Sequence, residues 1–483
     1  MPEDSSTEHH PEGPAETQPG HRPESAAGRP NESAPESPIG QPPVIFGQDG
    51  ARLHYALPVA LHRAGLLQAM YTDWYRDGSR RASLALAIVR LLAPASARRL
   101  EQRYCEELAA VPVYCLQFTG PLFILACRAI APVWLRQLII QPWWQAAARR
   151  GPLAHPRGGG TVYFTFTHNL PPATARKLKT RGYRLVVDQP LATAAEVARQ
   201  QQCARERWPH WEIEGATVPP AVAQIAASAA PPAAPAGDAA VQELDALVDH
   251  WTCASGYVHQ SLVEVGVRAE KISVLPYPVD VRELASVDRS GHTGPVVVGF
   301  VGVVNLRKGA PWFLEVARRL EAEDAKFVMV GPIQLSEFGR AEMGRHVDLV
   351  GAVPRSDILP RLAGFDIFLF PSTCEGSAGA VMEAMATGLP IVTTPNTGSI
   401  VRDGVDGFIR PYDRSEELAA CVQQLVADQG LRLDMGRSAR RNAESHDINA
   451  YSVKIAALMR RVVAGPVGPG SAAAPYPGPR PEN

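Results

Sequence analysis

The chain has 483 residues, of which 46% are hydrophobic and 20% are charged, and its formal net charge is −1. One hydrophobic core rarely organises more than about 250–300 residues, so we expect at least two domains. The near-zero charge argues against a uniformly basic protein that binds nucleic acid. The cysteines number seven, are scattered and form no C-x-x-C pair. They therefore predict neither a disulfide framework nor a zinc site, and they favour a reducing compartment.

Membrane and export signals are weak. Residues 1–5 lack the basic start and apolar run of a secretory signal, so we expect a cytoplasmic location. The most apolar stretch, residues 120–144, is interrupted by Arg128, Pro132 and Arg136, which makes it a poor membrane-spanning helix. A peripheral contact with the inner face of a membrane stays open as an expectation.

Three stretches have compositions that cannot bury enough surface to offset their ordering entropy. Residues 1–42, rich in Pro, Glu, Ser and Gly, and residues 465–483 are predicted to be disordered tails. Residues 218–237 form an Ala/Pro run, which predicts a long loop inserted within a domain.

The first half alternates short apolar runs with amphipathic stretches. Four runs predict strands: residues 43–46, 161–166, 183–187 and 272–275. Helices are predicted over residues 53–66 and 172–179, and Pro172 suits the first turn of its helix because its missing N–H has no helical partner there.

The charge of this half is uneven. Residues 44–200 carry 20 Lys and Arg against 8 Asp and Glu, a net charge of +12. The excess indicates either a solvated basic surface or attraction to an anionic acceptor or an acidic membrane face.

The second half repeats the alternation more cleanly. Strands are predicted at residues 296–301, 327–330, 347–350, 366–370 and 391–394, and helices at residues 311–320 and 377–387. Near-continuous apolar strands alternating with helices predict parallel sheets covered on both faces, which is an α/β fold. The polar residues 287–294 are the best candidate for a linker between two such sheets.

The most informative segment is Phe370-Pro-Ser-Thr-Cys-Glu-Gly-Ser-Ala-Gly, in which a buried strand runs through a small-residue loop into a helix. We expect Ser377 to cap that helix, and Gly388 with Pro390 to end it. The carboxyl end of the strand and the amino end of the helix would then meet at one edge of the sheet. Free N–H groups and the helix dipole favour an anion such as a diphosphate there.

Two glutamates flank this turn, Glu375 before the helix and Glu383 in its second turn. Ionised carboxylates are pure acceptors, which suits the hydroxyls of a sugar or a ribose. Acidic pairs at this spacing also arise by chance. The informative feature is that this pair lies within a strand, a glycine-containing loop and a helix in that order.

Taken together, these residues resemble the Glu-x₇-Glu motif of retaining GT-B glycosyltransferases of family 4, also called group 1. Further segments agree in order: Gly299-Phe-Val-Gly-Val-Val-Asn-Leu-Arg-Lys-Gly, which resembles the donor-phosphate loop, then residues 330–331, 349–351 and 396–408. The resemblance covers residues 296–445 and is thin before about residue 250.

The resemblance implies a role for each matching residue. Glu383 would hold the nucleotide ribose, Glu375 would hold hydroxyls of the donor sugar, and Lys308 with Arg307 would neutralise the diphosphate. Backbone N–H groups would line the diphosphate and sugar at Gly376, Ser377, Ala378 and Gly379. A departing nucleoside diphosphate gains negative charge, and fixed cations lower that barrier. The alternative for Arg307 and Lys308 is a solvated loop before a helix.

Several positions depart from the family pattern. The family often has an arginine directly after the glycine that matches Gly302, where this chain has Val303. Arg307 would then substitute for it. The Phe-Gly that usually follows the Glu-Gly pair is replaced by Ser377-Ala378, and Pro278 replaces the glycine of a Tyr-Gly-Val-Asp segment.

The amino-terminal half offers fewer matches. Residues 47–50, Gly-Gln-Asp-Gly, are the only match to the family's glycine-rich first loop, which places Gly50 near the donor phosphates. A histidine after a strand often faces the donor sugar in this family, and His168 is better placed than its rival His54. A lone histidine is more often structural. Residues 188–189, Asp-Gln, could meet the acceptor.

The expected architecture is therefore a GT-B fold, with two Rossmann-like domains whose parallel sheets face a central cleft. Residues 43–288 would form the acceptor side and residues 295–445 the nucleotide-sugar side. By resemblance, the amphipathic residues 446–463 would form a helix that crosses back to the first domain.

The expected function is transfer of a hexose-type sugar from a nucleotide-sugar donor to a sugar or lipid-linked acceptor with retention, in polysaccharide or glycolipid synthesis. The resemblance implies no metal or other cofactor, because basic side chains and helix dipoles replace a metal. Two alternatives stay open: a degenerate GT-B protein that acts as a non-catalytic binding partner, and a sugar-nucleotide epimerase. A dehydrogenase is disfavoured because residues 158–160, Gly-Gly-Gly, precede a strand, and a P-loop NTPase is disfavoured because its motif is missing from the sequence.

Overall fold

The computed structural model describes residues 41–76, 80–115, 120–121, 153, 160–213, 236–281, 284 and 286–464. The predicted tails, residues 1–42 and 465–483, lie almost wholly outside the described residues, as do the predicted Ala/Pro loop and most of the apolar stretch 120–144.

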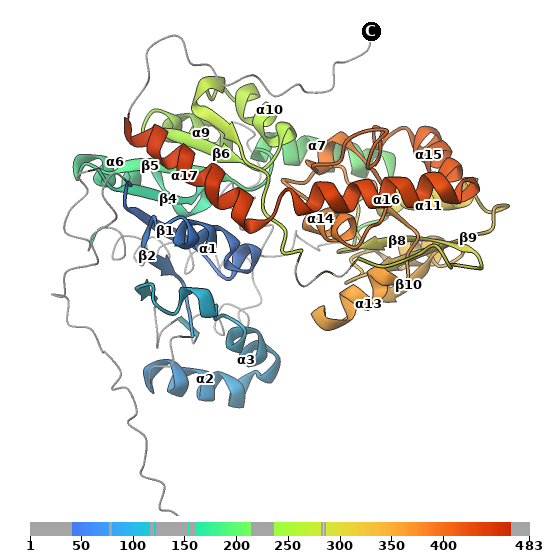
Figure 1. Cartoon of the computed structure of the whole chain (residues 1–483), viewed down its shortest axis with the longest axis horizontal. Coiled ribbons are helices and arrows are strands. Elements are labelled where there is room, and N and C mark those ends of the chain that lie inside the picture. The colour runs from blue at the N-terminus through green and yellow to red at the C-terminus, as the bar shows by residue number, and fades with distance from the viewer. Residues whose placement is uncertain are drawn as a thin grey trace, which may run out of the picture. The chain divides into compact units, whose positions relative to one another are not determined.

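The first sheet has seven parallel strands in the order β3-β2-β1-β4-β5-β6-β7. Figure 1 labels β1, β2, β4, β5 and β6 of this sheet. The strands are β1 (Val44–Gln48), β2 (Leu67–Thr72), β3 (Val113–Tyr114), β4 (Val162–Phe166), β5 (Arg184–Gln189), β6 (His250–Cys253) and β7 (Ile272–Val274). Neighbouring side chains of β1 point to opposite faces and enter separate cores, Phe46 into one and Ile45 into the other. Burial on both faces explains why these strands are continuously apolar.

The helices between these strands cover the sheet or form a separate layer. They are α1 (Ala56–Arg63), α2 (Arg80–Leu92), α3 (Pro94–Glu101), α6 (Pro172–Thr180), α7 (Ala194–Arg207), α9 (Ala236–Asp245) and α10 (Gly256–Glu264). The helices α2 and α3 pack on Trp74 in a small core of their own.

The second sheet has six parallel strands in the order β10-β9-β8-β11-β12-β13. The strands are β8 (Val296–Val301), β9 (Ala325–Val330), β10 (Asp348–Gly351), β11 (Ile367–Phe370), β12 (Ile391–Thr393) and β13 (Gly407–Ile409). The helices are α11 (Ala310–Arg319), α12 (Glu337–Met343), α13 (Ile358–Ala363), α14 (Gly379–Ala386), α15 (Ser415–Ala427) and α16 (Gln429–Glu444). Strand order reverses between β8 and β11, and ligands of open α/β sheets bind at such a switch point.

The last described helix, α17 (Ile448–Ala464), packs against α1. Its Tyr451, Ile455 and Met459 share a core with Val44 and Phe46 of β1. The chain thus leaves the second sheet and ends, in the described residues, against the first.

The structure corrects two local predictions. Ser377 does not cap α14: the helix begins at Gly379, Ala378 is at the N-cap position, and no side chain bonds the helix end there. The predicted helix over residues 53–66 begins only at Ala56, since Leu53 and the two residues after it have positive φ angles of 49°, 50° and 65°. Such left-handed conformations interrupt a right-handed helix.

The polar stretch 287–294, predicted to be a linker, is attached by hydrogen bonds to the domain of the second sheet. Arg289 is buried and donates hydrogen bonds to the carbonyls of Phe365 (2.6 Å), Thr387 (2.8 Å) and Leu362 (2.9 Å). A buried guanidinium needs such acceptors. The sequence pattern, which counts only polarity, does not reveal that this arginine is fixed to the second sheet's domain.

Candidate active site

The predicted site residues lie in the loops that follow two adjacent strands of the second sheet. β8 and β11 pair in parallel, so their carboxyl ends lie side by side. The loop after β8 carries Arg307 and Lys308, and the loop after β11 carries Glu375 before α14 begins. Residues that are far apart in the chain therefore meet at one edge of the sheet.

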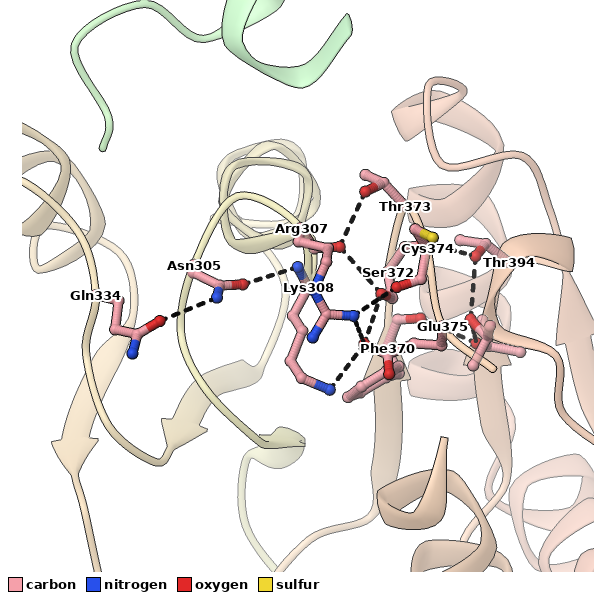
Figure 2. A network of polar contacts seen from close by, with 12 residues as sticks. Asn305, Arg307, Lys308, Gln334, Phe370, Ser372, Thr373, Cys374, Glu375 and Thr394 are labelled. Atoms are coloured by element: carbon pink, nitrogen blue, oxygen red, sulfur yellow. Dashed lines mark hydrogen bonds and ion pairs between the residues drawn. The ribbon is translucent and has the colours of Figure 1, made fainter. Parts of the chain in front are cut away.

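The two cations and the carboxylate are in direct contact (Figure 2). Arg307 Nη1 and Lys308 Nζ each lie 2.8 Å from Oε1 of Glu375. Ser372 Oγ lies 3.3 Å from the same oxygen. All three contacts therefore converge on Oε1, and Figure 2 shows the cationic side chains approaching it from one side. We call Arg307, Lys308 and Glu375 the charged cluster.

Backbone and side-chain bonds fix the two loops to each other. The Arg307 carbonyl accepts bonds from Thr373 N (2.9 Å), Thr373 Oγ1 (3.0 Å) and Ser372 Oγ (3.0 Å). Asn305 Oδ1 accepts a bond from Lys308 N at 3.0 Å. The charged cluster is thus held by its main chain as well as by its side chains.

Burial and charge act together on the charged cluster. Burial alone would raise the pKa of Glu375, but the charges of Arg307 and Lys308 and the bonds from Lys308 and Ser372 outweigh it, so the pKa is lowered. Burial lowers the pKa of Lys308, and the Glu375 charge opposes this only in part. Lys308 Nζ also lies 5.1 Å from the centroid of the Phe370 ring, within the range of a cation–π contact.

Glycine is required where the loops touch. Gly309 has φ +83°, and a Cβ there would lie 2.0 Å from the Pro371 carbonyl oxygen. At Gly302 a Cβ would lie 3.4 Å from Cδ of Lys308, which places this predicted residue beside the charged cluster.

Cys374, next to Glu375, is not activated as a nucleophile. Burial raises the pKa of its thiol to about 12, so the thiol stays protonated at neutral pH. Its carbonyl contributes instead, accepting a bond from Arg307 Nη1 at 2.6 Å.

The loop that enters α14 is tightly enclosed at Gly376. A Cβ there would lie 1.8 Å from the Pro190 carbonyl oxygen, and the Gly376 carbonyl accepts a bond from Ser255 Oγ at 2.6 Å. Ser377 is partly exposed and Ala378 is buried, and Gly379 opens the helix. N–H groups at the start of a helix generally lack partners within the helix, and such an end favours an anion.

Glu383 lies on α14, separate from the charged cluster. Its Oε1 pairs with Arg355 Nη2 at 2.5 Å. Arg355 comes from a short 3₁₀ turn (Arg355–Asp357) after β10, and its side chain is largely exposed. An exposed pair of this kind is weak and exchanges readily with a ligand.

A second set of polar residues lies at the carboxyl ends of β1 and β4 in the first sheet. His168 Nε2 lies 2.8 Å from Asp49 Oδ1, and the His168 ring stacks on Phe166. Gly50 N donates to Asp73 Oδ1 at 2.9 Å. His168 and Gly50 thus belong to one edge of this sheet. The rival His54 is exposed within the left-handed turn before α1.

The prediction that residues 188–189 meet an acceptor is wrong for Asp188. Its carboxylate is buried and accepts bonds from Thr252 Oγ1 (2.7 Å) and Tyr277 OH. Gln189 is also buried, and its Nε2 donates to the Leu191 carbonyl at 2.8 Å. Both side chains serve the packing of the first sheet.

Sequence reasoning missed three residues at these two edges: Arg355, Asp49 and Asp73. The sequence does not point to Arg355, because a single arginine after a short predicted strand belongs to no recognisable motif. Asp49 could have been found, since it lies between Gly47 and Gly50 directly after a buried strand. Within the residues that the structure describes, no three His, Cys, Asp or Glu side chains are arranged to hold a metal ion.

Comparison with known proteins shows which family the domain of the second sheet resembles. Residues 295–428 match the sequence model of the family "Glycosyl transferases group 1". A curated relative is N,N'-diacetylbacillosaminyl-diphospho-undecaprenol alpha-1,3-N-acetylgalactosaminyltransferase of Campylobacter jejuni, 29% identical over 209 residues, which are 41% of this chain and 53% of the relative. The chain thus spans about half the length of the curated relatives it matches.

Solved structures share the fold across both sheets. Sucrose-phosphate synthase of Thermosynechococcus elongatus aligns with a TM-score of 0.57 at 15% identity, covering 88% of this chain and 100% of that one. Alr3699/HepE of Anabaena, solved with UDP and glucose, aligns with a TM-score of 0.51 at 15% identity, covering 86% of this chain and 99% of that one. The predicted GT-B fold is confirmed. Residues 295–428 are similar to the group 1 glycosyltransferases, and the two sheets together have the GT-B fold.

Proposed function

We propose that this protein transfers a sugar from a nucleoside-diphosphate sugar to an acceptor hydroxyl, with retention of configuration, in the synthesis of a polysaccharide or glycolipid. The observation that carries the proposal is the charged cluster: Arg307 and Lys308 lie on one oxygen of Glu375 at the switch point of the second sheet. Open α/β sheets bind ligands at this position.

The charged cluster matches a diphosphate in charge. Two cations and one carboxylate leave a net charge of about +1, and both cations are largely withdrawn from water. Lys308 and Arg307 would neutralise the charge that develops on the leaving diphosphate. The N–H groups of residues 376–379 would bind the phosphate oxygens from the amino end of α14.

The two glutamates would bind the neutral parts of the donor. Since the cations contact Oε1 of Glu375, its Oε2 would accept bonds from the donor-sugar hydroxyls. Glu383 would exchange its exposed Arg355 partner for the ribose hydroxyls. Gly302, beside Lys308, and Gly50, on the first sheet, would let the main chain approach the phosphates.

The first sheet would supply the acceptor side, with His168 directed to the donor sugar. We assign no carboxylate nucleophile. In the proposed step the bond between the anomeric carbon and the phosphate oxygen breaks, and the acceptor oxygen bonds to that carbon on the same face. The acceptor proton passes to the departing phosphate oxygen, which balances the charge.

The names of relatives support this substrate class. The Campylobacter relative is named for transfer to a diphospho-undecaprenol acceptor, and an Escherichia coli relative that is 25% identical is named for transfer from UDP-Gal to such an acceptor. We therefore propose a lipid-linked acceptor at the inner face of a membrane. Neither the degenerate binding protein nor the epimerase is favoured by these names.

A ligand panel tests the proposal. The melting temperature of the full chain is measured with UDP, GDP, ADP and their sugars, and one nucleotide series should raise it through binding to the folded state. Transfer is then assayed with that donor, and NMR of the anomeric proton in the product tests retention. No stabilisation by any member of the panel would contradict the proposal.

A further inference from the structure

Three other segments of the chain meet at Gly376, in the loop that enters α14. Ser255 Oγ donates a hydrogen bond to the Gly376 carbonyl at 2.6 Å, and the Pro190 carbonyl lies so close that a Cβ on Gly376 would be 1.8 Å from its oxygen. Gly398 has φ +64°, and a Cβ there would lie 2.4 Å from the Gly376 carbonyl oxygen and 2.5 Å from Ser255 Oγ. Ser255 and Gly376 are both buried, so the bond between them is largely withdrawn from water.

Ser255 belongs to the first sheet's side of the molecule, where it follows β6 and is the N-cap residue of α10. Its Oγ accepts a bond from Val258 N at 3.3 Å. This cap uses only a lone pair of the oxygen. The hydroxyl proton is not needed for the cap, and the structure directs it to the Gly376 carbonyl.

The bond from Ser255 also fixes the direction of the next N–H group. Gly376 and Ser377 are joined by a trans peptide, in which the C=O and N–H groups point in opposite directions. Because Ser255 holds the C=O, the Ser377 N–H points away from Ser255. Ser377 is partly exposed, whereas Gly376 is buried. An N–H group whose direction is fixed in advance stabilises developing negative charge without a cost of reorientation.

We propose that Ser255 is a positioning residue of the donor site: its hydroxyl holds the Gly376 carbonyl so that the Ser377 N–H faces the donor diphosphate. This inference rests on the proposed function, in which the N–H groups of residues 376–379 bind the phosphates. The side of the first sheet thereby contributes to donor binding in addition to acceptor binding.

Two substitutions of Ser255 separate its two bonds. Ser255→Ala and Ser255→Gly both remove the hydroxyl, but glycine is a much better N-cap residue than alanine, so only the alanine variant loses much of the cap's stability. UDP, GDP and ADP are titrated into each full-length protein by calorimetry. Uridine, guanosine and adenosine, which lack phosphates, are titrated by ligand-observed NMR.

We expect both Ser255 variants to bind the nucleoside diphosphate at least about fivefold more weakly than the wild type, because each loses the bond that orients the Ser377 N–H. Affinity for the corresponding nucleoside should stay unchanged. Ser255→Ala should have the lower melting temperature of the two, with a similar loss of diphosphate affinity.

The matched control is Ser336→Ala. Ser336 is the N-cap residue of α12, where its Oγ accepts a bond from Gly339 N at 3.1 Å and donates one to the His210 carbonyl at 2.5 Å. It therefore makes the same two kinds of bond as Ser255, but its acceptor is not in the loop that enters α14. This variant should bind the nucleoside diphosphate like the wild type.

Three results would overturn the inference alone: diphosphate affinities equal to that of the wild type in both Ser255 variants, a loss in Ser255→Ala without one in Ser255→Gly, or equal losses for nucleoside and diphosphate. The second result would assign the effect to the cap, and the third to general damage of the site. A wild type that bound none of the three diphosphates would overturn the proposed function and this inference together.

Discussion

The Lys308 ammonium lies 2.8 Å from Glu375 Oε1, although the two residues are 67 positions apart in the chain. They come from the loops after β8 and β11, and Arg307 contacts the same oxygen. The family resemblance gives these residues separate roles, the cations on the diphosphate and the carboxylate on the sugar. The structure joins them in one charged cluster, so a change in one residue should alter the behaviour of the others.

Lys308→Ala should lower the rate of transfer at least about tenfold, since a charge-assisted contact contributes about 1.5–3 kcal/mol. Steady-state kinetics with the donor found in the ligand panel measure the effect. Lys326→Ala is the control, because Lys326 is exposed on β9 of the same sheet. A folded Lys308→Ala variant with unchanged turnover would refute the role of Lys308.

Glu383→Ala should weaken donor binding about tenfold with a similar melting temperature. The carboxylate is proposed to hold the ribose, whereas its present partner Arg355 is 60% exposed and an exposed pair contributes at most about 1 kcal/mol. Calorimetry with the nucleotide measures the affinity.

Arg355→Ala serves as the control for Glu383→Ala, because it breaks the same ion pair and keeps the carboxylate. The account expects this variant to bind nucleotide at least as well as the wild type. Equal nucleotide affinity in Glu383→Ala and the wild type would count against the ribose role.

The activity should fall as the pH rises, and this fall should begin at a lower pH than it would if Lys308 had the usual pKa of a lysine. Burial lowers the pKa of Lys308 below its usual value of 10.5, so its proton, and with it the attraction for the diphosphate, is lost earlier as the pH rises. Glu375, whose pKa is lowered from 4.5, stays ionised throughout this range. A pH profile of kcat/KM measures this limb.

In Lys308→Arg the guanidinium keeps its proton at high pH. Whatever activity this variant retains should therefore extend to higher pH than that of the wild type. An unchanged alkaline limb in this variant would show that another group controls the decline.

Gly309→Ala should lower the free energy of unfolding by at least about 2 kcal/mol. A left-handed residue with a Cβ costs about 1–2 kcal/mol, and the new Cβ would also collide with the Pro371 carbonyl. Chemical denaturation measures the change. Gly291→Ala is the control, since nothing lies within 4 Å of its Cβ position, and a comparable loss in both variants would contradict the argument.

The second sheet could be predicted well because each of its long apolar runs is a buried strand. The predicted strand at residues 296–301 coincides with β8, and the predicted helix at 311–320 differs from α11 by one residue at each end. Burial on both faces makes each strand a continuous apolar run, and such a run can be recognised in the sequence.

Four strands were not predicted: β2, β3 and β6 of the first sheet and β13 of the second. They are short or mix polar with apolar residues, so none of them forms a long apolar run.

The candidate site could be predicted only in part. The sequence identified Glu375, Lys308 and Arg307 individually, by motif, but not that both cations share one oxygen. That contact depends on strand order, which periodicity does not encode. The Asp188 prediction failed for a similar reason: a carboxylate at the end of a strand was expected to face a ligand, whereas Tyr277 and Thr252 enclose it.

The most direct test of the charged cluster is calorimetric titration of UDP, GDP and ADP into the full chain and into Lys308→Ala. The account predicts that at least one of these nucleotides binds the wild type and binds the variant at least about tenfold more weakly. Failure of all three to bind the wild type, or equal affinities for the two proteins, would contradict it.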